Sequence, residues 1–231
     1  MSTSGTYNFN PTLGEITLYA FNLAGVRNTS LLQEHMVSAR MAANMMLAEW
    51  SNMGPDLWKV DLVQEPLIQG QETYAVDPKT IVILDAYTRI DNGISPPVDR
   101  IITPISRSEY ASYPNKTQQG TVSVYWMDRL ISPTVTLYQV PDGVSAQFLR
   151  YYRVTQVQDA NFTSGQQVDI PYRWFNAFTN GLALELARNW NPPMVGALQP
   201  FADRSYQRAA AQDVETSNLY VSPTLSGYFR P

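Results

Sequence analysis

In the stretch MMLAEWSNMGPDLWKVDLVQEP, residues 45–66, the spacing of apolar side chains changes from that of a helix to that of a strand, and this change decides the fold. Up to Met53 the apolar side chains recur every three or four positions, which is typical of an amphipathic helix. Gly54 and Pro55 end this pattern, because a glycine past the last turn followed by a proline stops a helix. From Lys59 onward, short runs rich in Val, Ile, Thr and Tyr indicate strands. The chain is therefore predicted to pass from helix to sheet at this point.

Upstream of this change the sequence predicts a short helix and a long one. The short helix begins at Glu15 and stops near Gly25. The long helix covers about 30–53, with Ser30 as a cap whose hydroxyl meets the open amides of the first turn. Its apolar stripe comprises Leu32, Met36, Ala39, Ala43, Met46, Leu47, Trp50 and Met53.

Downstream of Lys59, turn sequences divide the chain into short strands. Pro141-Asp142-Gly143 is the sharpest hairpin signal among them, and a helical turn is expected over 106–113. The expected strands cover 59–66, 72–76, 80–90, 98–103, 121–127, 134–140 and 146–157. Together they predict a mainly antiparallel β region.

Helical periodicity returns at Pro171, which suits the first turn of a helix because its missing amide hydrogen is not needed there. Helices are predicted over 171–190 and 194–217. Their packing against the helix at 30–53 would place Met46, Trp50, Leu182 and Leu186 in one core.

The predicted fold class is α+β: a helical bundle from the N- and C-terminal helices, an inserted mainly antiparallel β region and an extended C-terminal arm. The boundaries are an N-terminal arm at 1–14, the bundle at 15–58 and 170–217, the β-rich insertion at 59–169 and a C-terminal docking arm at 218–231.

The end of the chain carries no charged residue from Thr216 to Phe229. Such a segment is too apolar for a solvated linker and too short to bury itself. Pro223 and Gly227 oppose a helix, so we expect an extended arm that docks on a partner protein or a neighbouring subunit. The alternative is that it folds back on its own subunit. The predicted partner-binding residues are Leu219, Tyr220, Val221, Leu225, Tyr228, Phe229 and Arg230.

The composition excludes several kinds of catalytic site. The chain has no cysteine, which rules out thiol catalysis and Cys-ligated zinc. His35 is the only histidine, so a Ser-His-Asp triad or a multi-histidine metal site cannot form within one chain. No glycine pattern of a phosphate-binding loop occurs. We therefore expect a protein that is not an enzyme and uses no cofactor or metal.

The charge content favours contacts with other proteins. Only 16% of the residues are charged, against about 25% in an average domain, and interface cores are depleted in charge. The net charge of −4 argues against tight nucleic-acid binding but allows transient passage of DNA. The start of the chain has no signal-peptide pattern, so we expect an unexported protein that enters no membrane.

Some residues have both a functional and a structural interpretation. Paired carboxylates could act as acid and base, but a solvated surface, salt bridges between subunits or the lining of a ring channel would explain them as well. The candidates are Asp56, Asp61, Glu65, Asp85 and Asp91. His35 is expected to be a partly exposed packing residue or a subunit contact. Glu185 is expected to pair with Arg188 on the helix surface or to lie buried at a subunit contact.

The run Arg150-Tyr151-Tyr152-Arg153 interleaves basic and aromatic side chains, which can stack on nucleotides. In a strand, however, neighbouring side chains point to opposite faces, so only half of the run could meet one ligand. Ordinary sheet surface is therefore the favoured interpretation.

Several segments, in this order, resemble the phage head-to-tail adaptor family related to the podoviral packaged-DNA stabilisation protein. They are the entry Ile16 to Gly54, then Leu67-Ile-Gln-Gly-Gln-Glu-Thr-Tyr74, Ile105-Ser-Arg-Ser-Glu-Tyr110, Asn115-Lys-Thr-Gln-Gln-Gly120, Leu137-Tyr-Gln-Val-Pro-Asp142 and Ile170-Pro-Tyr-Arg-Trp-Phe175. The similarity spans about 16–215, and the order and spacing of the segments carry it. It implies a homo-oligomeric ring, usually twelvefold, between the portal and the tail tube or nozzle, and no catalysis.

We therefore expect a virion structural protein at the head-tail interface, assembled in the host cytoplasm, that forms part of the DNA channel. The alternative is a β-rich tail component whose 59–157 sheet binds a host glycan or receptor. A virion-associated glycan hydrolase is the third interpretation.

Overall fold

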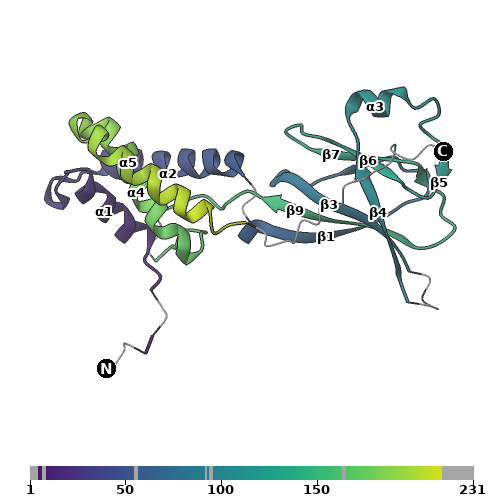
Figure 1. Cartoon of the computed structure of the whole chain (residues 1–231), viewed down its shortest axis with the longest axis horizontal. Coiled ribbons are helices and arrows are strands. Elements are labelled where there is room, and N and C mark those ends of the chain that lie inside the picture. The colour runs from purple at the N-terminus through teal and green to yellow at the C-terminus, as the bar shows by residue number, and fades with distance from the viewer. Residues whose placement is uncertain are drawn as a thin grey trace, which may run out of the picture.

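The computed structural model describes residues 5–6, 9–54, 57–91, 93, 96–162 and 165–214. Within them the predicted α+β class is confirmed: the chain has helices and a mixed sheet. All the α-helices except the short one at Arg107–Ser112 gather at one end of an elongated molecule, and the sheet forms the other end together with that short helix (Figure 1). The first and last helices therefore lie together, although the whole sheet separates them in sequence.

Helix α1, Leu13–Leu23, begins earlier than the predicted start at Glu15. The Thr12 hydroxyl accepts a hydrogen bond from the Glu15 N–H at 3.3 Å, and the Glu15 carboxylate accepts one from the Thr12 N–H at 2.8 Å. This capping box satisfies amides that have no partner inside the helix. The predicted start is wrong because Glu15 is the third residue of the helix and serves its cap.

Helix α2, Gln33–Met53, begins after the predicted cap at Ser30. Ser30 instead closes the 3₁₀ turn η1, Asn28–Ser30, where its hydroxyl donates to the carbonyl oxygen of Arg27 at 2.7 Å. The Leu32 N–H at the start of α2 donates to Nδ1 of His35 at 3.1 Å. The predicted Ser30 cap is therefore wrong, because the tight turn uses that hydroxyl.

The C-terminal helices each follow a 3₁₀ turn. Turn η3, Tyr172–Trp174, leads into α4, Phe175–Trp190, and turn η4, Pro192–Met194, leads into α5, Val195–Ala210. Helix α5 ends well before the predicted end at residue 217, and Ala211 and Gln212 already form a turn.

Helix α4 packs against α1, α2 and α5 and supplies the centre of an apolar core. Leu182 and Leu186 are fully buried and Met46 is 5% exposed, so their predicted burial is confirmed. Trp50 is only partly buried, because it lines a cavity described below.

The main sheet has seven strands in the order β1-β9-β3-β4-β6-β7-β2. Neighbours are antiparallel except β4 and β6, which run parallel and make the sheet mixed. The strands are β1 Val60–Pro66, β2 Thr73–Ala75, β3 Thr80–Ile90, β4 Val98–Pro104, β6 Val124–Asp128, β7 Thr134–Tyr138 and β9 Gln147–Thr155. A separate apolar core on this sheet includes Ile102, Leu137, Leu149 and Tyr151.

The sequence Pro141-Asp142-Gly143 forms a turn but not a hairpin. Asp142 accepts a hydrogen bond from the Val144 N–H at 3.1 Å, and Gly143 has a φ of +72°. The short strand before the turn, β8 Val140–Pro141, pairs in parallel with β5 Gln119–Gly120 and not with β9. The hairpin prediction is therefore wrong, because a turn sequence does not determine which strand becomes the partner.

The short helix α3, Arg107–Ser112, confirms the helical turn predicted over 106–113. Its cap is Ser106, whose hydroxyl accepts a hydrogen bond from the Glu109 N–H at 3.1 Å. No helix among the described residues is both long and apolar enough to cross a membrane.

Candidate partner-binding surfaces

The predicted partner-binding residues follow Val214, the last residue that the structure describes. Leu219, Tyr220, Val221, Leu225, Tyr228, Phe229 and Arg230 thus lie outside the described residues. Their role stays a prediction, but the structure does place the point from which this segment leaves the fold.

Asp213, the residue before Val214, anchors the chain at this point. Its carboxylate forms an ion pair with Arg173 and accepts a hydrogen bond from the Leu57 N–H at 3.3 Å. The Asp213 side chain is only 5% exposed, and a buried charge is tolerated when it is paired and hydrogen-bonded. These contacts tie the end of α5 to η3 and to the 3₁₀ turn η2, Leu57–Lys59. The segment after Val214 therefore starts where the helices meet the sheet.

A cavity of about 610 Å³ opens at this place, and we call it the junction cavity. Its aromatic walls are Trp50 of α2, Trp174 of η3 and Tyr206 of α5. The ring centroid of Trp50 lies 5.2 Å from that of Trp174 and 5.4 Å from that of Tyr206. Leu84 and Asp85 of β3 complete the lining on the side of the sheet. The volume is in the range of ligand pockets, about 300–1,000 Å³.

The lining of the junction cavity includes apolar side chains that are exposed to solvent. Met53 is 55% exposed, Leu84 37% and Val214 66%. An apolar surface grouped around one opening is typical of a contact site. Behind the wall, the Trp58 ring lies 5.2 Å from that of Trp174, and the Arg173 guanidinium lies 5.7 Å from the Trp58 ring. The aromatic wall is thus supported by packed side chains.

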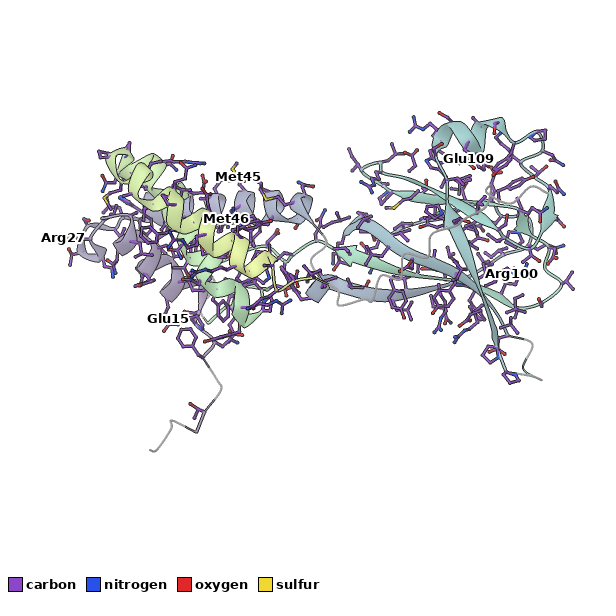
Figure 2. The ribbon with its side chains drawn as sticks, viewed as in Figure 1. Glu15, Arg27, Met45, Met46, Arg100 and Glu109 are labelled. Carbon is purple, nitrogen blue, oxygen red and sulfur yellow. The ribbon has the colours of Figure 1, made fainter. Side chains whose placement is uncertain are left out.

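A second apolar surface lies on the outer face of α2. Val37, Met41 and Met45 are 60%, 54% and 64% exposed, and Ala48 is exposed as well. These four residues recur at helical spacing on one face, and we call them the α2 stripe. Met45 points away from the other helices, whereas Met46 beside it faces them (Figure 2). Nothing within the described chain covers the stripe.

His35 is buried, so its predicted partial exposure is wrong. It is 8% exposed, and its ring stacks on Trp190 of α4 with centroids 4.0 Å apart and planes 25° apart. The edge of Phe21 from α1 also approaches it, with centroids 5.9 Å apart. Because its Nδ1 also caps α2, His35 is a structural residue at the meeting point of three helices.

The described carboxylates of the predicted acid–base set have different surroundings. Asp61 forms an ion pair with Arg153 at 2.8 Å, and Asp91 accepts a hydrogen bond from the Gly93 N–H at 3.0 Å within a turn. Both are explained by structural contacts. Asp85 lines the junction cavity, Glu65 lies on β1, and Asp56 lies outside the described residues.

The surface pair predicted for Glu185 is confirmed, whereas the run 150–153 is ordinary sheet surface only in part. Glu185 pairs with Arg188 on the surface of α4 at 2.6 Å. In β9, Tyr151 is 2% exposed and faces the sheet core, whereas Tyr152 is 40% exposed on the opposite face. The aromatic residues of this run therefore do not form one continuous platform.

Among the described residues, no group of three His, Asp or Glu side chains could hold a metal ion. No protein-family model matches the chain, and no curated protein matches its sequence. The sequence reasoning missed the junction cavity, because its wall combines residues from α2, β3, η3 and α5 that are far apart in the chain. The exposed α2 stripe could have been noticed, since Val37, Met41 and Met45 recur at a spacing of four.

Proposed function

We propose that this protein is a structural subunit of a phage virion, a head-to-tail adaptor that forms a ring, docks on the portal and connects it to the tail. The observation that carries the proposal is the α2 stripe, a methionine-rich apolar face that the described chain leaves uncovered. Methionine is enriched in protein interfaces, where its flexible side chain adapts to the partner surface.

A ring requires contacts between two different faces of the same subunit, because each copy binds one neighbour on either side. We assign the α2 stripe to one of these faces, so that its occupant is the next copy of this chain. In this arrangement the N- and C-terminal helices form one bundle in the ring wall. Viral DNA would pass transiently through the ring, and the C-terminal arm would reach the portal.

Mass photometry of the purified protein tests the ring. The wild-type protein is expected to have about twelve times the mass of one chain. Met41→Glu is expected to give single chains, because it places a charge in the centre of the proposed contact. Ile131→Glu is the matched control, since Ile131 is 96% exposed in the connection between β6 and β7, away from α2.

Circular dichroism would first show that both variants fold like the wild type. Single chains of wild-type protein at micromolar concentration, or unchanged rings in Met41→Glu, would contradict the proposal. Electron microscopy of the rings mixed with portal protein then tests the docking itself, with end-on complexes as the expected result.

One observation favours a second candidate, a sheet that binds a host glycan. Tyr152 of β9 is 40% exposed and lies opposite Asp85 of β3 and Leu62 of β1, which places an aromatic ring beside a carboxylate on one sheet face. Sugars bind to such pairs through ring stacking and hydrogen bonds to the carboxylate. Glycan-array binding that is lost in Tyr152→Ala would support this candidate over the adaptor.

A further inference from the structure

We infer that the segment after Val214 folds back into the junction cavity of its own subunit, with Leu219, Tyr220 and Val221 as the occupying side chains. The inference does not depend on the adaptor function. It concerns how a single chain covers the apolar opening between α2, α5 and β3 before it meets any partner.

The first argument is the position at which the segment leaves the described fold. Val214 is itself part of the cavity lining, and Asp213 before it is fixed by Arg173 and by the Leu57 N–H. An extended chain advances about 3.3–3.6 Å per residue, so Leu219 can be no more than roughly 18 Å from Val214. Because closing so short a loop costs little entropy, the local concentration of the segment at the cavity is in the millimolar range.

The second argument is chemical. The segment from Thr216 to Phe229 carries no charge, and the wall that it would contact is formed by Trp50, Trp174 and Tyr206. Asp213 at this wall is neutralised by Arg173, and the carboxylate of Asp85 on the sheet side of the lining is exposed to solvent. Large aromatic rings offer a broad apolar surface, against which the side chains of Leu219 and Val221 would pack.

The third argument is the order of the apolar side chains in the segment. In the proposed extended conformation side chains alternate, so Leu219 and Val221 would share one side and Tyr220 would lie on the other. We assign Leu219 and Val221 to the interior of the cavity and Tyr220 to the exposed apolar side chains at its opening, Met53 and Leu84. One short segment would then cover the whole opening.

Because the chain has no cysteine, an engineered disulfide can test this inference without competing thiols. The test protein carries Met53→Cys in the cavity lining and Ser222→Cys directly after the occupying residues. A disulfide forms only when the two Cα atoms come within about 7 Å of each other. The matched control has the same two cysteines with Leu219, Tyr220 and Val221 all changed to Ser, which preserves the length and reach of the segment.

The rate of disulfide formation is followed on non-reducing gels and by mass spectrometry, at a concentration at which single chains predominate. The expected result is an intramolecular disulfide that forms at least tenfold faster in the test protein than in the control. Far-UV circular dichroism shows whether both proteins are folded, which we expect because every altered position is exposed or outside the described fold.

Equal rates in the two proteins would mean that the segment is free and would overturn the inference. Disulfide-linked dimers in place of linked monomers would also overturn it, because the segment would then occupy the cavity of another copy. Neither result affects the ring test with Met41→Glu, so failure of this inference and failure of the proposed function can be told apart.

Discussion

Truncation of Leu182 to alanine should strongly destabilise the helical end of the molecule. The side chain is fully buried in α4, within the apolar core that α4 shares with α1, α2 and α5. The change removes three buried carbon groups, each worth about 0.8 kcal/mol of transfer free energy. The remaining cavity adds a further cost because packed neighbours relax only partly, which gives a total loss of about 3–4 kcal/mol.

Thermal unfolding followed by circular dichroism at 222 nm is the assay. For a chain of 231 residues, each kcal/mol shifts the Tm by about 2–4 °C, so Leu182→Ala should melt roughly 6–16 °C below the wild type. Glu185→Ala on the same helix is the control. It breaks only a surface pair with Arg188, which is worth about 0.5 kcal/mol or less. A Leu182→Ala protein that melts within 2 °C of the wild type would refute the assigned core.

Two further predictions concern the ends of helices. Hydrogen bonds from Thr12, first from its backbone N–H and then from its hydroxyl, hold the pKa of Glu15 below its ordinary value of 4.5. Ionised Glu15 therefore favours folding above that value, and this contribution is lost as the pH falls through the lowered pKa. An NMR titration should show the pKa of Glu15 rising part of the way toward 4.5 in Thr12→Ala, because the backbone N–H remains; no change would contradict the capping box. Asp213→Ala should lower the free energy of unfolding in urea by about 1–2 kcal/mol, since it leaves Arg173 and the Leu57 N–H without their acceptor. An unchanged urea midpoint would show that the end of α5 is not anchored there.

The sequence by itself determined the elements. The step of three or four residues predicted α2 and α4, and the alternation after Lys59 predicted each strand of the main sheet within a few residues. These patterns are local, because one face of a helix or strand is marked by neighbouring positions in the chain. Helix ends were less accurate: Ser30 was misassigned as a cap because serine suits both a cap and a tight turn.

Only the tertiary structure decided which segments meet. It buried His35 between Phe21 and Trp190, and it paired β8 with β5 although the turn after Pro141 is typical of a hairpin. It also formed the junction cavity from Trp50, Trp174 and residues of β3 and α5. Contacts of this kind depend on how helices and strands pack, and no periodicity along the chain records which distant face a side chain will meet. The spacing of Val37, Met41 and Met45 is visible in the sequence, but only the packing of the other helices showed that the described chain leaves this face of α2 uncovered.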